Sequence, residues 1–231
     1  LRGFEALTRW NHPTRGPIPP SIFIPIAEES GLIIELSDLV LVRACRQLRL
    51  WQEIDPSLRD LKLQVNMSAA DLAHSALFER VARALRSTHF TPHLLTLELT
   101  ESILMTGVES ALPALDALRR LGVSLAIDDF GTGYSSLSYL STLPIDSLKI
   151  DRSFVHGMRL GSKDAEIVRA IVSLGATLGK SVVAEGIETV SQLAQLRELG
   201  CEHGQGFHLS QPLTAADAQV LLEMIVAEGR E

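Results

Sequence analysis

The sequence has little cysteine, little excess positive charge and no long apolar run, and each scarcity excludes a class of protein. Only Cys45 and Cys201 occur, and neither belongs to a paired motif, so a disulfide framework is not expected and a reducing compartment is indicated. The formal net charge of −7 argues against a surface that binds DNA or RNA irrespective of sequence. No apolar run reaches the length of a membrane span, and no secretory signal is visible. These absences predict a cytoplasmic domain without a membrane segment, although upstream segments of a parent protein could anchor it.

The chain instead shows a globular composition and a regular alternation of strand and helix patterns. Its 231 residues are 46% hydrophobic, which is enough to bury a substantial core. Short apolar runs typical of buried strands alternate with segments whose apolar residues recur every three or four positions, as in helices. No linker-like or low-complexity break interrupts the alternation, so we predict one α/β domain over residues 1–231. The expected strands cover residues 1–7, 61–65, 94–97, 123–127, 145–150, 181–184 and 201–207.

Seven strands of this kind predict a (β/α)₈ TIM-like barrel that lacks its first strand and helix. A closed barrel of this class has eight strands, and the chain begins at Leu1 inside an apolar, strand-like stretch. We therefore expect the chain to be an N-terminally truncated piece of a longer polypeptide. The alternative is an open doubly wound sheet, but no glycine-rich phosphate fingerprint follows the first strand.

Every predicted strand ends in a polar residue. In a barrel these ends meet at one rim, where (β/α)₈ enzymes place their catalytic groups. The set is rich in carboxylates and contains neither cysteine nor histidine, so it favours a hard cation such as Mg²⁺ or Mn²⁺ over zinc. Its members are Glu5, Asn66, Glu98, Asp128 with Asp129, Lys149, Glu185 and Gln205.

Asp128 and Asp129 form the most informative pair, because they follow strand 123–127 directly and precede a glycine-rich loop. Adjacent carboxylates repel each other and need a positive partner, most simply a divalent cation. The alternative is an ordinary turn, since Asp and Gly are common turn residues. Two aspartates suit two ions, and paired ions activate water for displacement at phosphorus. This pattern predicts phosphoester hydrolysis, with Lys149 orienting the water or neutralising developing charge unless it is a plain surface lysine.

Eight short blocks, in order along the chain, resemble the motifs of EAL domain phosphodiesterases, which hydrolyse the bacterial second messenger cyclic di-GMP. The resemblance implies hydrolysis of cyclic di-GMP to linear pGpG, with water activated by two Mg²⁺ or Mn²⁺ ions. The blocks are Glu5-Ala6-Leu7, Asn66-Met67-Ser68 and residues 20–28, 98–102, 128–136, 148–151, 183–189 and 204–207.

The resemblance also implies a role for each matching residue. One ion would be held by Glu5, Asn66, Glu98 and Asp128, and a second by Asp129 with Asp128 as the bridge. The catalytic groups would be Glu185, Lys149 and Glu5, where Lys149 contacts the water and Glu185 is a general base or metal-shell group. Arg9 and Gln205 would contact the substrate, unless Arg9 simply faces solvent. Glu101 would pin the loop 130–136, a mobile loop that couples metal binding to dimer contacts.

The expected partners are cyclic di-GMP, a second copy in a homodimer, and an upstream sensory or GGDEF-type domain. An alternative is a catalytically silent EAL-type receptor that binds cyclic di-GMP and signals through a partner or dimer interface. Such family members typically lack some metal ligands, and none of the matching positions is missing here. A third hypothesis, a Mg²⁺-dependent barrel enzyme acting on carbon acids, fits the ordered motifs poorly.

Overall fold

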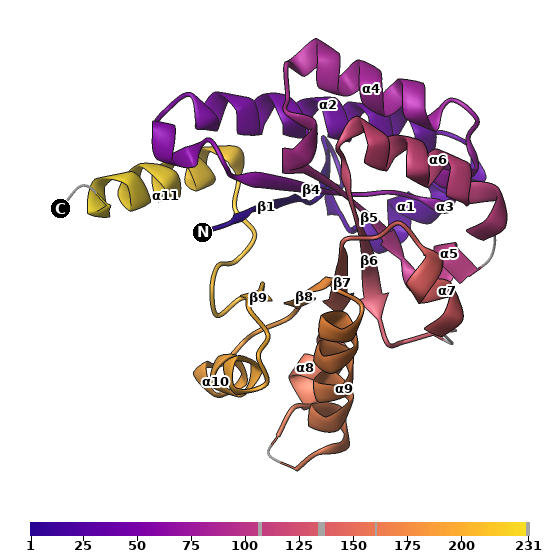
Figure 1. The fold of residues 1–231 in the computed structure, drawn as a ribbon. Helices are drawn as coiled ribbons and strands as arrows, with labels where there is room; N and C mark the ends of the chain where they lie inside the picture. The colour runs from indigo at the N-terminus through magenta and orange to yellow at the C-terminus, as the bar shows by residue number, and fades with distance from the viewer. Residues whose placement is uncertain (106–107, 134–136, 160, 230–231) are drawn as a thin grey trace. The chain divides into compact units, whose positions relative to one another are not determined.

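The computed structural model of the protein describes residues 1–105, 108–133, 137–159 and 161–229 (Figure 1). The chain divides into two compact units. The first unit comprises Leu1–Leu97, Pro113–Ser124 and Thr214–Glu231, and the second comprises Glu98–Leu112 and Leu125–Leu213. Among the residues described, we find no helix with both the length and the apolar character needed to cross a membrane.

Seven strands form one sheet in the order β1-β4-β5-β6-β7-β8-β9. Strands that are neighbours in the sheet therefore follow one another in the sequence, as in a singly wound barrel, whereas a doubly wound sheet reverses its direction. The pairs β1–β4, β6–β7, β7–β8 and β8–β9 are parallel. The predicted α/β class with seven strands in TIM-barrel order is confirmed, and one domain over residues 1–231 stays a prediction. The strands are β1 (Gly3–Ala6), β4 (Lys62–Asn66), β5 (Leu95–Thr100), β6 (Ser124–Phe130), β7 (Ser147–Ile150), β8 (Ser181–Ala184) and β9 (His203–Gly204).

The helices follow the predicted apolar periodicity closely. The periodicity predicts helices over residues 21–29, 34–52, 108–121, 164–178, 189–199 and 215–226, and the observed ends lie within one or two residues of these bounds. The α-helices are α1 (Pro20–Glu29), α2 (Ile33–Gln52), α3 (Ala69–Ala73), α4 (Leu77–Thr88), α5 (Glu101–Met105), α6 (Val108–Leu121), α7 (Leu137–Thr142), α8 (Arg152–Gly157), α9 (Lys163–Thr177), α10 (Val190–Glu198) and α11 (Ala215–Glu228), with short 3₁₀ turns at Pro56–Leu58 and Pro92–Leu94.

In the first unit, α2 and α4 run side by side (Figure 1), and α2 also packs against β4. The face of α2 that carries Leu41, Cys45 and Leu48 is buried. In β4, Leu63 and Val65 are buried while the residues between and beside them are not, which is the alternation of a strand with one face on the core.

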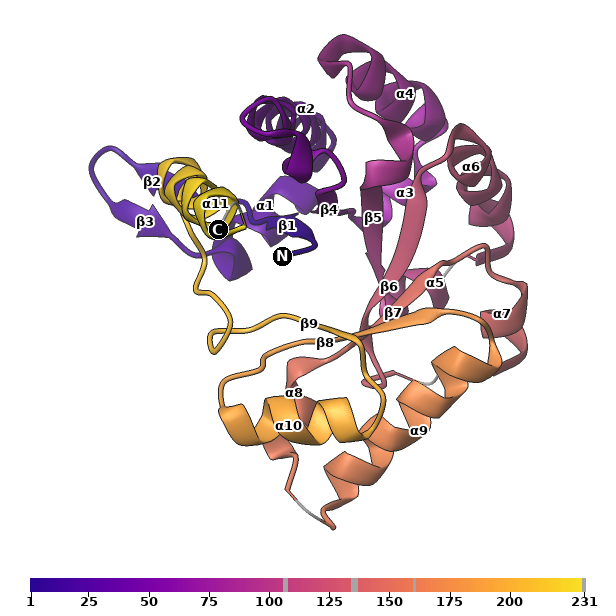
Figure 2. The same cartoon turned by 60° about the vertical axis from the view of Figure 1, so that its left-hand side comes forward.

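In the second unit, all four residues of β7 are buried. Helix α9 packs against β7 and β8, and α8 packs against α9 (Figure 2). A strand covered on both faces normally consists of apolar residues. Lys149 in the middle of β7 breaks that rule, so its ammonium group needs partners inside the protein.

A short hairpin of β2 (Trp10–His12) and β3 (Gly16–Ile18) lies in a segment outside the seven strands expected from the sequence. Its strands are too short and too exposed to show a two-residue alternation. The hairpin is closed by His12, whose Nδ1 accepts hydrogen bonds from the backbone N–H of Thr14 and Arg15. Trp10 meets Phe23 of α1 edge-on, with ring centroids 5.8 Å apart.

Strand β6 differs from the prediction in a way that matters for the site. The expected strand ended at residue 127, but β6 runs through Phe130, so Asp128 and Asp129 lie inside the strand. The register against β7 shifts between Ile127 and Phe130, and Asp129 has a left-handed φ of 54°. The aspartates thus occupy a β-bulge, not the strand-exit turn that was the alternative hypothesis.

The end of α4 supplies a stability prediction. His89 caps this helix in the left-handed conformation, with φ 52°. Glycine adopts that conformation without the steric cost that an L-residue bears. We expect His89→Gly to raise the free energy of unfolding by about 0.5–1 kcal/mol, after allowing for the larger chain entropy of unfolded glycine.

A matched control is His74→Gly, because His74 also ends a helix but has φ −79° and accepts a hydrogen bond from the Ala76 N–H. This control should lose stability. Urea unfolding of both variants measures the difference, and a loss of stability in His89→Gly would contradict the prediction.

Candidate active site

Lys149 is the centre of the polar cluster in the second unit. Its side chain is 1% exposed, and its Nζ lies 2.8 Å from Glu98 Oε2, 3.3 Å from Asp128 Oδ1 and 2.6 Å from Glu185 Oε1. These residues come from β5, β6 and the residue that follows β8. Burying an ammonium group is costly unless it is paired and hydrogen-bonded, and these three carboxylates supply the pairing.

In the ion pairs described around Nζ, the carboxylates outnumber the ammonium group. One ammonium faces three carboxylates, and Glu98 is itself buried. Asp128 Oδ1 is buried and has no hydrogen-bond partner among the described residues, apart from its ion pair with Lys149. An excess of buried negative charge attracts a further cation.

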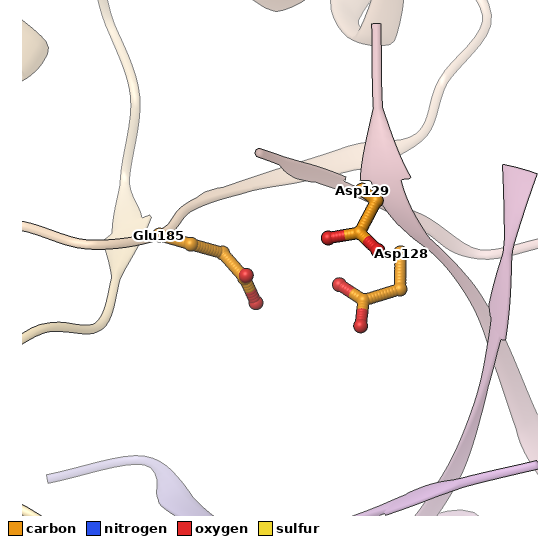
Figure 3. A group of neighbouring side chains, drawn as sticks. All are labelled: Asp128, Asp129 and Glu185. Atoms are coloured by element: carbon orange, nitrogen blue, oxygen red, sulfur yellow. The ribbon is translucent and has the colours of Figure 1, made fainter. Parts of the chain in front are cut away.

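Asp128, Asp129 and Glu185 form a group that could hold that cation. Each offers a carboxylate oxygen, and the three oxygens lie within 4.8 Å of one another. Figure 3 shows the two aspartates side by side with the Glu185 carboxylate extending toward them. Successive side chains of a regular strand point to opposite faces, so the bulge at Asp129 is what lets both aspartates reach this group.

The donors of this group fit a hard divalent cation. All are carboxylate oxygens, which Mg²⁺ and Mn²⁺ prefer and which do not form a typical zinc site. The oxygen-rich chemistry expected from the sequence is therefore present in the second unit.

The pKa of Asp129 is raised from 3.8 to about 6. Burial is the main cause, followed by repulsion from Asp128 and Asp151 and by a hydrogen bond with Asp151, while Lys149 acts in the opposite direction. A cation at this group would favour the ionised form of Asp129, so metal binding and loss of its proton are linked.

Asp151 is a site residue to which the sequence prediction gave no role, although it ends the 148–151 block. It caps the N-terminus of α8 by accepting a hydrogen bond from the Ser153 N–H at 3.0 Å. Burial raises its pKa, but the hydrogen bonds from Ser153 and Asp129 and the charge of Arg152 outweigh burial and leave the pKa below its ordinary value. The hydrogen bond between Asp129 and Asp151 places Asp151 beside the bulge, a proximity that spacing alone does not reveal.

Glu185 and Gln205 directly follow β8 and β9, and their backbone N–H groups continue the hydrogen bonding of the sheet past the ends of these strands. The Glu185 N–H donates to the carbonyl of Ile150, and the Gln205 N–H donates to that of Ala184. Gln205 Nε2 also donates to Glu185 Oε1 at 2.8 Å. Glu185 is therefore oriented by two side chains, Lys149 and Gln205.

Glu101 fixes the start of the loop that follows β6. Its side chain is 2% exposed, and Oε2 accepts hydrogen bonds from the backbone N–H of Gly131 at 2.9 Å and of Gly133 at 3.2 Å. A Cβ on Gly133 would lie 2.8 Å from Glu101 Oε1, so a side chain there would disturb this contact. The loop-stabilising role of Glu101 stays a prediction. Residues 134–136 of the predicted loop 130–136 lie outside the described residues.

The first unit carries the other predicted site residues. Asn66 Nδ2, at the end of β4, donates to Glu5 Oε1 of β1 at 2.9 Å. The parallel pairing of these strands places Glu5 opposite Gln64, so the amide reaches diagonally across to the carboxylate. Arg9 is exposed, and its Nη1 donates to the carbonyl of Thr8 at 3.0 Å.

Comparison of the sequence with known proteins establishes its family. The EAL domain family model matches residues 1–212. The chain belongs to the EAL domain family. Among curated relatives, it is 48% identical over 213 residues to the bifunctional diguanylate cyclase/cyclic di-GMP phosphodiesterase MucR of Pseudomonas aeruginosa, covering 92% of this chain and 31% of the relative. It is 46% identical over 218 residues to the cyclic di-GMP phosphodiesterase NbdA of the same organism, covering 94% of this chain and 28% of the relative.

A solved structure of the family shows the same fold. The PaMucR phosphodiesterase in complex with c-di-GMP aligns with a TM-score of 0.88 and 47% identity, over 94% of this chain and 87% of that one. The chain spans less than a third of the length of the curated relatives MucR and NbdA.

The raised pKa of Asp129 yields a pH prediction. A carboxyl group whose pKa is higher in the folded than in the unfolded state costs stability as the pH rises from about 4 to about 6, and this cost stays constant above that range. Asp129→Asn removes the titration, and asparagine tolerates a left-handed φ. In chelator, the melting temperature of Asp129→Asn minus that of the parent protein should therefore grow between pH 4 and 6.5 and then level off.

Glu166→Gln is the control for loss of one acidic charge, because Glu166 lies exposed on α9. Its melting-temperature difference from the parent should vary little with pH. The assignment of the titration to Asp129 fails if the two variants behave alike.

Proposed function

We propose that this EAL domain is a metal-dependent phosphodiesterase that hydrolyses cyclic di-GMP to linear pGpG. The observation that carries the proposal is the buried Lys149 within an excess of carboxylates, next to the Asp128–Asp129–Glu185 group. The similarity to MucR and NbdA, whose names include this activity, and to a structure that contains c-di-GMP supports the substrate.

The proposed cofactor is Mg²⁺ or Mn²⁺, as two ions. Asp128 and Asp129 would hold metal, with Glu98, which lies beside Lys149 in the same cluster, as a further ligand, while Glu185 of the same group is assigned to proton transfer. When bound, divalent ions lower the pKa of water and stabilise negative charge at a phosphoryl group. Glu5 and Asn66 as further ligands, and Asp128 as the bridge between two ions, stay predictions from the sequence.

Glu185 is the proposed general base. In the hydrolysis, the water oxygen bonds to phosphorus and one ester P–O bond breaks. One proton of the water passes to the Glu185 carboxylate, and the leaving ribose oxygen takes up a proton from solvent. Lys149 and Gln205 hold Glu185 Oε1 at 2.6 Å and 2.8 Å, so the carboxylate is oriented before substrate arrives. The Lys149 ammonium would also offset negative charge on the phosphoryl group.

The remaining roles belong to the same proposal. Arg9 has the guanidinium fork that suits a substrate phosphate, and Gln205 would contact substrate in addition to Glu185. A homodimer, an upstream sensory or GGDEF-type domain, and a cytoplasmic location are likewise proposed.

Glu185→Gln tests the base directly. The variant keeps the size of the side chain but removes its ability to take a proton, so turnover of cyclic di-GMP with Mn²⁺ should fall by about 10²–10⁴-fold. Chromatography of the nucleotides measures pGpG formation, with and without chelator. The control Glu166→Gln removes an exposed charge on α9 and should retain full activity.

Three outcomes would contradict the proposal. Unchanged turnover in Glu185→Gln would show that Glu185 is not the general base. Unchanged turnover in chelator would show that hydrolysis does not depend on a metal. Tight binding of cyclic di-GMP without any pGpG from the parent protein would identify a silent receptor instead.

A further inference from the structure

A buried carboxylate in the first unit, Asp71, lies just beyond the Asn66-Met67-Ser68 block and has no part in the function proposed above. Its side chain is fully buried. Such burial is costly unless several donors satisfy the oxygens. The hydrogen bonds of Asp71 therefore indicate what the burial accomplishes.

One oxygen of Asp71 fixes the residue that starts α3. Asp71 Oδ2 accepts from the Ser68 N–H at 3.1 Å and from the Ser68 hydroxyl at 2.7 Å, and the Asp71 N–H donates back to Ser68 Oγ at 3.1 Å. This is a capping box, in which the backbone and side chain of Ser68 are held together.

The two Asp71 oxygens also tie Ser68 to two longer helices. The hydroxyl of Ser37 on α2 donates to Oδ2 at 2.7 Å, and Arg80 Nη2 on α4 donates to Oδ1 at 2.8 Å. Arg80 in turn binds α2 through Asp38 Oδ1 at 2.8 Å and the carbonyl of Ile34 at 2.9 Å. An ordinary capping box makes no contact of this kind with other elements, so Ser68 is anchored to the body of the unit.

The network is not arranged for stability alone. Arg80 Nη1 is buried without a hydrogen-bond partner among the residues that the structure describes, which costs free energy. Apolar side chains could join the same helices without this cost. An acceptor is needed, however, to hold the backbone N–H of Ser68, and an apolar side chain cannot supply one.

Ser68 lies two residues after Asn66, with Met67 between them. Asn66 is the last residue of β4, so the strand holds the backbone that precedes it in the chain. After Asn66, the next backbone group with a described hydrogen bond is the Ser68 N–H, which donates to Asp71. The position of the Asn66 amide beside Glu5 thus depends on two anchors, the end of β4 and Asp71.

We propose that Asp71 is a positioning residue that holds Asn66, through Ser68, in the orientation needed to bind a divalent cation. This inference rests on the proposed role of Asn66 as a metal ligand. Asp71 itself would touch neither metal nor substrate. Removing a residue that orients a metal ligand commonly lowers metal affinity by about 10–100-fold.

The test compares Asp71→Ala with Gln52→Ala by two readouts. Gln52 is a buried side chain of α2 that donates to the carbonyls of Arg59 and Leu61, next to the opposite end of β4, so its loss weakens the same unit away from Asn66. We expect Mn²⁺ affinity, measured by calorimetry, to fall about tenfold or more in Asp71→Ala and less than about twofold in Gln52→Ala. In metal-free protein, the side-chain amide NMR signals of Asn66 should shift in Asp71→Ala only.

A double-mutant cycle shows whether the effect passes through Asn66. In an Asn66→Ala background, Asp71→Ala should change Mn²⁺ affinity by less than about twofold, because the positioned amide is already gone. If Asp71→Ala does not fold, Ser37→Ala removes one hydrogen bond to Asp71 and should weaken Mn²⁺ binding about threefold with a smaller shift of the Asn66 signals.

The inference is overturned if a folded Asp71→Ala or Ser37→Ala protein keeps both the Asn66 signals and the Mn²⁺ affinity of the parent. It is also overturned if Asp71→Ala weakens binding equally with and without Asn66. Should the parent protein bind no Mn²⁺, the proposed function fails, and the metal-free Asn66 signals still decide whether Asp71 positions this amide.

Discussion

The chemistry of the second unit depends on one constraint, the burial of the Lys149 ammonium in the middle of a strand covered on both faces. Glu98, Asp128 and Glu185 surround Nζ at 2.6–3.3 Å, because an unpaired charge could not remain there. Three carboxylates more than balance one ammonium. Asp128 and Glu185 belong both to this cluster and to the Asp128–Asp129–Glu185 group, and the residual negative charge is the basis of the cation site proposed there.

The β-bulge in β6 determines where two of these carboxylates point. A regular strand would send Asp128 and Asp129 to opposite faces, and only one could face Glu185. The register shift and the left-handed φ of Asp129 turn both carboxylates to one side. The crowding of Asp129 against Asp128 and Asp151 adds to the effect of burial and raises its pKa to about 6. The backbone strain and the raised proton affinity of Asp129 are therefore aspects of one arrangement, and strain of this kind clusters at functional sites.

The sequence predicted the seven strands in barrel order, the long helices and the polar strand ends, because apolar periodicity is encoded locally. It placed Asp128 and Asp129 after the strand, since a bulge depends on pairing with β7 and leaves no local mark. It missed the β2–β3 hairpin, whose strands of three residues are too short for a pattern. Asp71 and Asp151 escaped for a related reason. Ser37 is 34 residues from Asp71 in the chain, Arg80 reaches Asp71 from the next helix, and the contact between Asp129 and Asp151 depends on the bulge.

Negative charge around the buried Lys149 is proposed to make a divalent-cation site. Calorimetric titration of Mn²⁺ into the chelator-treated protein and into Asp128→Asn, both at pH 7.5, tests this proposal. Asp128 belongs both to the ion pair with Lys149 and to the proposed metal group, so the variant should bind Mn²⁺ about tenfold or more weakly while remaining folded. Equal affinity in the two proteins, or no binding by the parent, would contradict the account.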